Sequence, residues 1–112
     1  MNYWLVKSEP DDCGIQHFVD KGSAAICWDG VRNYQERNFL RKMGTGDLVF
    51  LYHSSCKVIG IAGTLKVTRA AYPDLLQFDV ASRYFDAKST VDQPRWTAVD
   101  LVLHRAFKAV IG

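Results

Sequence analysis

The residues best suited to chemistry lie in the segment Cys27–Asn38, where an aromatic side chain precedes a turn and a helix start. Asn33 can cap that helix, while Glu36, three residues later, reaches back to the amide of the cap. The first turn of a helix exposes unpaired N–H groups and a partial positive charge, which suit an anion. Trp28 stands just before this turn. A flat face for stacking beside donors for an anion suits a nucleotide, although a single Trp is commonly a core residue.

Cationic side chains follow the aromatic residue, at Arg32, Arg37 and Arg41. A guanidinium group can hold a phosphate through two parallel hydrogen bonds. Arg32 and Arg37 are therefore candidates for a phosphate contact, and a solvated helix face is the alternative interpretation.

Other candidates stand where apolar runs end. Lys7 and Ser8 close the first run, where an ammonium and a hydroxyl group could meet a base edge or a phosphate. A surface lysine and a turn-capping serine would look the same. A later run closes with Tyr52, His53 and Ser54, and a histidine can donate or accept near neutral pH.

The cysteines indicate neither a disulfide framework nor a metal site. Cys13, Cys27 and Cys56 are odd in number and widely spaced, without a Cys-x-x-Cys pair. Cys56 lies three residues after His53, but nothing nearby supports a thiol–imidazole nucleophile. We expect reduced, partly buried thiols, and neither a metal nor a cofactor.

Length and charge restrict the function classes. A chain of 112 residues with 48% hydrophobic and 23% charged residues is sufficient for one globular domain over residues 1–112. A net charge of +2 is too small for nucleic-acid binding through bulk electrostatics, so any such function needs a local site. No apolar run approaches the ~20 residues that span a bilayer, and the N-terminus lacks a signal-peptide pattern. We expect no membrane partner and a cytoplasmic location, or a nuclear one in a eukaryote.

The strands and helices that must position these residues can be predicted from the spacing of apolar residues and from helix-capping residues. Continuous or alternating apolar runs predict strands, whereas the capped segment that ends at Gly44 predicts the main helix. We expect strands at 3–7, 47–53, 58–68 and 96–107, helices at 15–20 and 33–43, a turn at 8–12, and loops at Pro73 and 86–94. Residues 47–54 and 58–68 should pair as a hairpin, and Gly60 and Gly63 predict a bend or a close backbone approach. Trp4, Tyr34 and Phe39 are assigned to the core.

Joint motifs along nearly the whole chain resemble the EVE domain family. They are Trp4-x-x-Lys7-Ser8-Glu9-Pro10, Trp28-Asp29-Gly30-Val31-Arg32-Asn33-Tyr34-Gln35-x-Arg37-Asn38, Gly46-Asp47-x-Val49, Tyr52-His53-Ser54, Ala71-Tyr72-Pro73-Asp74, Phe78-Asp79, Tyr84-x-Asp86 and Pro94-Arg95-Trp96. The resemblance implies an α+β, PUA-like fold, in which short helices flank a curved, barrel-like mixed β-sheet. It also implies kinship with YTH domains, which read methylated adenine in RNA through an aromatic cage.

The family pattern assigns roles to particular positions. Trp28 resembles the first cage tryptophan, and Lys7-Ser8 resembles the pair that lines the YTH pocket. The hairpin from Phe50 through Gly60 to Ala62 resembles the far wall. Trp96 is a candidate cover for the pocket.

The chain departs from the family pattern after Phe107, where typical members continue with a further helix and strand. Without them, a sheet edge would stay open beside Val99, Leu101, Leu103 and Phe107. We therefore expect either a homodimer that covers this edge or a C-terminus that is disordered from about Ala106.

The function expected from these observations is a non-enzymatic module that binds DNA or RNA and recognises one modified base in an aromatic pocket. A small hydrolase of modified nucleosides, with Glu9 and Lys7 as an acid–base pair, is the first alternative. A truncated remnant that retains only an interaction role is the second.

Overall fold

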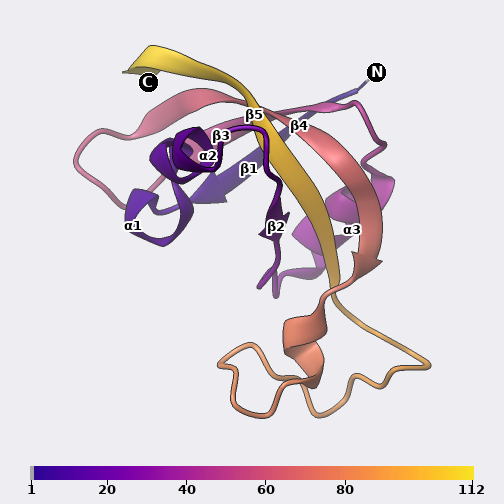
Figure 1. Ribbon diagram of the computed structural model, residues 1–112. Helices are drawn as coiled ribbons and strands as arrows, with labels where there is room; N and C mark the ends of the chain where they lie inside the picture. The colour runs from indigo at the N-terminus through magenta and orange to yellow at the C-terminus, as the bar shows by residue number, and fades with distance from the viewer. Residues whose placement is uncertain (1) are drawn as a thin grey trace.

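Five strands form one mixed sheet in the computed structural model, which describes residues 2–112 (Figure 1). The strand order is β1-β3-β4-β5-β2. The strands are β1 (Tyr3–Ser8), β2 (Ile26–Trp28), β3 (Leu48–His53), β4 (Gly60–Pro73) and β5 (Thr97–Ile111). The helices are α1 (Pro10–Cys13), α2 (Ile15–Lys21), α3 (Tyr34–Lys42) and the 3₁₀ helix η1 (Leu75–Phe78). The prediction of a mixed sheet with short flanking helices is confirmed.

The sheet curves because its two longest strands bend along their length (Figure 1). β1 runs parallel to β3, whereas β3–β4, β4–β5 and β5–β2 are antiparallel. The β4–β5 register shifts between Ile61 and Gly63, which marks a bulge. A Cβ atom on Gly63 would lie 2.4 Å from the carbonyl oxygen of Arg105, so the predicted close backbone approach is confirmed.

Alternation along the three central strands builds the core. The fully buried apolar residues of these strands are Val49, Leu51, Leu65, Val67, Ala98, Val99 and Leu101. Phe18 of α2 and Leu40 of α3 pack against the same cluster. Burial of each large apolar side chain contributes roughly 1.5–3 kcal/mol.

The predicted main helix forms with its predicted cap. The Asn33 side chain accepts a hydrogen bond from the Glu36 backbone N–H at 3.0 Å. Arg41 and Lys42 occupy the last turn, where cations suit the negative end of the helix dipole.

Several element boundaries differ from the predictions. The expected turn at 8–12 contains α1, because Pro10 at its first position needs no backbone donor and Asp11 and Asp12 suit a helix start. β4 starts at Gly60 rather than at residue 58, and it ends at Pro73, which was predicted to lie in a loop. A proline is tolerated at a strand end because few ladder bonds are lost there. β2 and η1 were not predicted, because both are too short to show a period.

Two aromatic residues assigned to the core lie at the surface. Tyr34 and Phe39 are 47% and 41% exposed, whereas the half-buried Trp4 packs against the core cluster as predicted. Both exposed rings lie on α3, whose short sequence offers only one fully buried position, Leu40.

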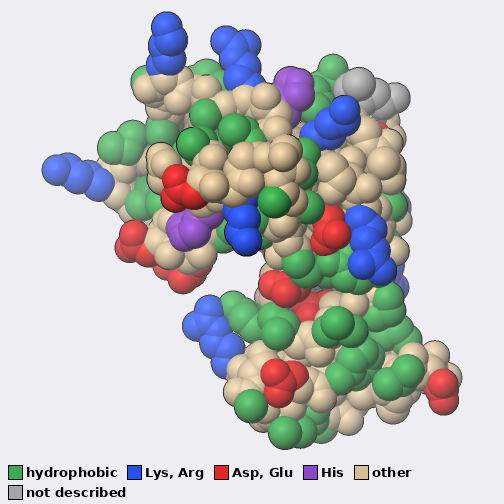
Figure 2. All heavy atoms as spheres, viewed as in Figure 1, with side chains coloured by type: hydrophobic (Ala, Val, Ile, Leu, Met, Phe, Trp, Pro, Cys, Tyr) green, Lys and Arg blue, Asp and Glu red, His purple; other side chains and the backbone are tan. Residues whose placement is uncertain are grey.

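The chain between β4 and β5 forms a lobe of its own below the sheet (Figures 1 and 2). Gln77 is fully buried there, and its side chain bonds to the backbone of Trp96 at both its oxygen and its nitrogen. Figure 2 shows a notch between this lobe and the sheet.

The C-terminal segment is not disordered from Ala106. β5 continues to Ile111, which pairs with Ile61 of β4, because the long β4 supplies ladder partners along this end. Within residues 2–112, no helix has the length and apolar character needed to cross a membrane.

Candidate functional site

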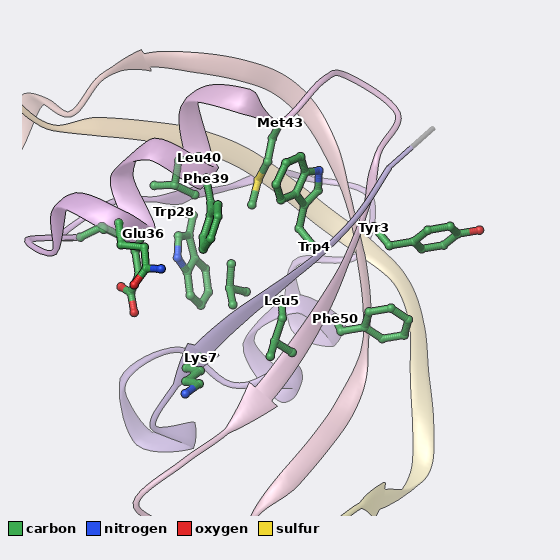
Figure 3. Close-up of a pocket in the computed structure, with 13 residues that line it drawn as sticks. Tyr3, Trp4, Leu5, Lys7, Trp28, Glu36, Phe39, Leu40, Met43 and Phe50 are labelled. Atoms are coloured by element: carbon green, nitrogen blue, oxygen red, sulfur yellow. The ribbon is translucent and has the colours of Figure 1, made fainter.

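Two cavities meet at Trp28. The first, here called the apolar groove, has a volume of about 620 Å³ and lies between β1 and α3. Figure 3 shows Leu5 and Lys7 of β1 across it from Trp28 and Phe39. The second, here called the polar cavity, has a volume of about 530 Å³ and lies in the notch between α1 and the lobe (Figure 2).

Trp28 is held as a fixed wall between the two cavities. Its ring is 8% exposed and stacks on Phe18 with the ring centroids 6.4 Å apart. β2 places it by pairing Trp28 with Val99 of β5. The residue is therefore both a core residue and a cavity wall, so the two interpretations of the sequence are compatible.

Three of the predicted residues reach the polar cavity through strand pairing. β1 and β3 are parallel, so their carboxyl ends coincide and Ser8 lies beside His53. The Ser54 backbone N–H donates to the Ser8 carbonyl at 3.0 Å, which brings the two serines together. Lys7, Ser8 and Ser54 all line the cavity.

Arg32 also lines the polar cavity, but the fold already uses its donors. Its Nη1 pairs with the fully buried Asp74 at 3.0 Å, and its Nε and Nη2 both donate to the Tyr84 carbonyl. The guanidinium lies between the rings of Tyr84 and Trp96, 5.3 and 5.2 Å from their centroids. Arg32 thus fastens the lobe to the Trp28 segment.

The remaining predicted residues do not line the polar cavity. His53 is buried, and its Nε2 accepts from the Ile15 backbone N–H at 3.1 Å, which anchors α2. Burial lowers the pKa of His53, which favours the neutral ring that this bond requires. Tyr52 does not line the cavity itself, and its ring centroid lies 5.9 Å from the Lys7 ammonium, which does.

Asn33, Arg37 and Trp96 serve the lobe and the helix. Asn33 caps α3, and Arg37 donates to the Arg95 carbonyl at 3.1 Å. Trp96 is buried, stacks on Tyr34 at 4.9 Å and donates from its indole to Asp86 at 2.7 Å. Trp96 was expected to cover the pocket, but it does not line the polar cavity.

Most of the charged groups in the polar cavity were not predicted. They are Asp12, Asp29, Glu36 and Arg83, whereas Glu9 was predicted only as part of the alternative acid–base pair. The position of Asp29 directly after Trp28 could have identified it as a site residue from the sequence. Arg83 lies in a loop without periodicity, so the sequence offers no such indication for it. Gly30 has a φ of 75°, and a Cβ atom there would lie 3.0 Å from the Tyr84 ring, so the lobe approaches closely only because this residue is glycine.

Burial changes the acid–base behaviour of the groups beside Trp28. The pKa of Asp29 is raised, first by burial and then by the nearby Asp74 carboxylate. Burial also raises the pKa of Cys27 to about 11, so this thiol stays protonated and is a poor nucleophile at neutral pH. In the described part of the chain, no group of three or more His, Cys, Asp or Glu side chains could hold a metal ion.

Comparison with known proteins adds a family and several solved structures. The family model described as the EVE domain matches residues 2–112. Mouse thymocyte nuclear protein 1 is 43% identical over 119 residues, which cover 98% of this chain and 53% of the mouse protein. The chain thus spans about half the length of the curated relatives it matches.

The solved structures superpose closely. A Pseudomonas syringae protein has a TM-score of 0.92 and 50% identity, over 98% of this chain and 72% of its own. The human THYN1 protein, solved in complex with DNA that contains 5-methylcytosine, has a TM-score of 0.90 and 42% identity. That match covers 99% of this chain and 70% of the human one.

Proposed function

The chain belongs to the EVE domain family, and from this premise we propose that it is a non-enzymatic module that binds nucleic acid. The polar cavity beside Trp28 holds a single base, and that base is a modified one. DNA with 5-methylcytosine is the first ligand to test, because the human relative was solved with it.

The observation that carries the proposal is the convergence of separate segments on one cavity. Lys7 and Ser8 end β1, Trp28 ends β2, and Ser54 follows β3, yet all four line the polar cavity. Its volume of about 530 Å³ lies within the ~300–1,000 Å³ of small-molecule sites. An aromatic wall beside hydroxyl and ammonium donors supplies stacking and edge recognition together.

Recognition of one base also agrees with the small net charge of +2. A protein that follows a long backbone track needs a large excess of Lys and Arg. A base inside duplex DNA must leave the stack to enter a cavity, at a cost of a few kcal/mol. Stacking on an aromatic ring returns roughly 1–3 kcal/mol, so we expect tighter binding to single strands than to duplexes.

The test measures fluorescence anisotropy with a single-stranded oligonucleotide that carries one central 5-methylcytosine. Lys7→Gln removes an exposed donor at the cavity, and we expect it to weaken binding about tenfold. Lys66→Gln is the matched control, because Lys66 is an exposed lysine on β4 away from the cavity.

Trp28→Phe is the second variant of this test, since it keeps an aromatic ring in the core. It should weaken binding and leave the melting temperature within a few degrees of the parent value. Equal effects of Lys7→Gln and Lys66→Gln, with no effect of Trp28→Phe, would reject the site.

The hydrolase alternative rests on one observation, which is that Lys7 and Glu9 both line the polar cavity. Incubation with modified nucleosides, followed by chromatography, separates the two functions. A product that the parent protein forms and the Glu9→Gln variant does not would establish turnover and contradict the non-enzymatic proposal.

A further inference from the structure

The charges that line the polar cavity constrain which part of a nucleotide can enter it. Three cations line the cavity: Lys7, Arg32 and Arg83. Arg32 is already neutralised by the buried Asp74 at 3.0 Å. Two cations therefore remain, and they face four carboxylates, which belong to Glu9, Asp12, Asp29 and Glu36.

An excess of carboxylates opposes a phosphate inside the cavity, because like charges in a partly enclosed site repel. The group that enters must instead bring hydrogen-bond donors, since an ionised carboxylate can only accept. Among the parts of a nucleotide, the exocyclic amino group of a base meets this requirement.

Asp29 is the carboxylate best placed to accept from the base. It follows Trp28 directly in the chain, and both residues line the polar cavity. Within residues 2–112, its only side-chain hydrogen-bond partner is the Cys27 thiol at 3.5 Å, which is a weak donor. The carboxylate therefore keeps acceptor capacity beside the stacking surface.

From this geometry we infer that Asp29 determines base specificity by accepting from an exocyclic amino group, so that the site selects cytosine-type bases over thymine. This inference rests on the proposed function. Carboxylates pair with the cytosine N4 amino group, whereas thymine presents the O4 acceptor at the same position, which an ionised carboxylate repels. The methyl group is common to 5-methylcytosine and thymine, so the two bases differ only at the 4-position and at N3, which carries a proton in thymine and none in 5-methylcytosine.

The test uses two single-stranded oligonucleotides that differ only in one central base, 5-methylcytosine or thymine, with affinity measured by fluorescence anisotropy. The parent protein should prefer the 5-methylcytosine strand by about tenfold, within the range measured for one good base contact. Asp29→Asn has nearly the same shape and should abolish this preference. Asp29 is only partly buried, so the variant should fold, and its circular dichroism spectrum and melting temperature verify that.

Asp11→Asn is the matched control, because Asp11 is an exposed aspartate of α1 that does not line the cavity. It should keep the preference. If the parent binds both strands equally, or if Asp29→Asn keeps the preference, the inference about Asp29 is wrong while the proposed function stands. If the parent binds neither strand, the proposed function fails and takes the inference with it.

A third oligonucleotide, with a central adenine, tests whether Asp29 also accepts from the amino group of a purine. A strand with a central adenine carries the N6 amino group, and we expect it to bind more weakly than the 5-methylcytosine strand but to lose affinity in Asp29→Asn as well. An adenine strand that Asp29→Asn leaves unaffected would contradict amino-group recognition by Asp29.

Discussion

Arg32 shows how a residue that looks suited to a ligand can be used by the fold instead. A guanidinium has five N–H donors in a fixed fork, and here the fork spans a buried carboxylate and a carbonyl of the lobe. The side chain that resembles a phosphate contact in sequence is thus a link between the lobe and the Trp28 segment.

We expect Arg32→Met to destabilise the protein by roughly 3 kcal/mol, because it leaves Asp74 buried without its cation. The side chain of Arg32 is 22% exposed, which places the cost at the lower end for a buried pair. Urea denaturation measures the change, and Arg105→Met, at an exposed position of β5, is the control. Normal stability with lost nucleic-acid binding would identify Arg32 as a ligand contact.

The sequence predicts residue types better than it predicts which way side chains point. Trp28, Lys7 and Ser8 converge as the family pattern implies. His53 does not, because in β3 it shares the inward face with Val49 and Leu51. The apolar run 48–52 is continuous in sequence, so it contains no alternation from which to infer this direction.

At the scale of elements, the loop that ends α3 is tied to the start of β1 by one carboxylate. Asp47 accepts from the Trp4 indole and the Gly44 N–H, both at 2.9 Å, and from the Asn2 N–H at 3.1 Å. These bonds favour the ionised form and lower the pKa of Asp47 from 3.8 to about 2.

A lowered folded-state pKa has a defined consequence for stability. The contribution of Asp47 is complete above its ordinary pKa of 3.8 and is lost as the pH falls towards about 2. We expect Asp47→Asn to lower the melting temperature at pH 6 and to have a shrinking effect as the pH approaches 2. Thermal unfolding over this range measures it, and a difference that does not depend on pH would contradict the role of the carboxylate.

The strands and helices whose apolar residues recur at a regular spacing were predicted from the sequence, whereas the structure of the lobe was not. The segment between Asp79 and Trp96 contains turns held by single side chains such as Gln77 and Asp86, which show no repeat in sequence. Arg83 and Tyr84 reach the polar cavity from this lobe. Their position depends on Gly30, whose missing Cβ admits the Tyr84 ring, and that contact joins residues far apart in the chain.

At the scale of the whole molecule, the edge expected to be open at β5 is covered by β2 only from Val99 to Leu101. Val99 and Leu101 are fully buried within one chain, so a partner would gain little by covering them. Two exposed apolar side chains lie at β1, where Tyr3 and Leu5 are 63% and 50% exposed, and others lie elsewhere on the surface. In the described residues β1 pairs only with β3, which leaves its other edge without a neighbouring strand.

We therefore predict a homodimer that forms through β1, not through β5. A second copy fits this edge because pairing of β1 with itself is symmetric and closes without further contacts. Sedimentation equilibrium should show concentration-dependent association that Leu5→Lys abolishes. Leu75→Lys, at a 72% exposed leucine of η1, should leave it unchanged. A monomer at every concentration would contradict the prediction.

Trp28 belongs to both the apolar groove and the polar cavity, so one indole ring is a boundary for two separate volumes. Anything in the groove that shifts this ring changes the free energy of a base in the cavity. By thermodynamic reciprocity, the base then changes the affinity of the groove for its occupant by the same factor. The two cavities are therefore coupled to the extent that an occupant of either one moves the shared indole ring.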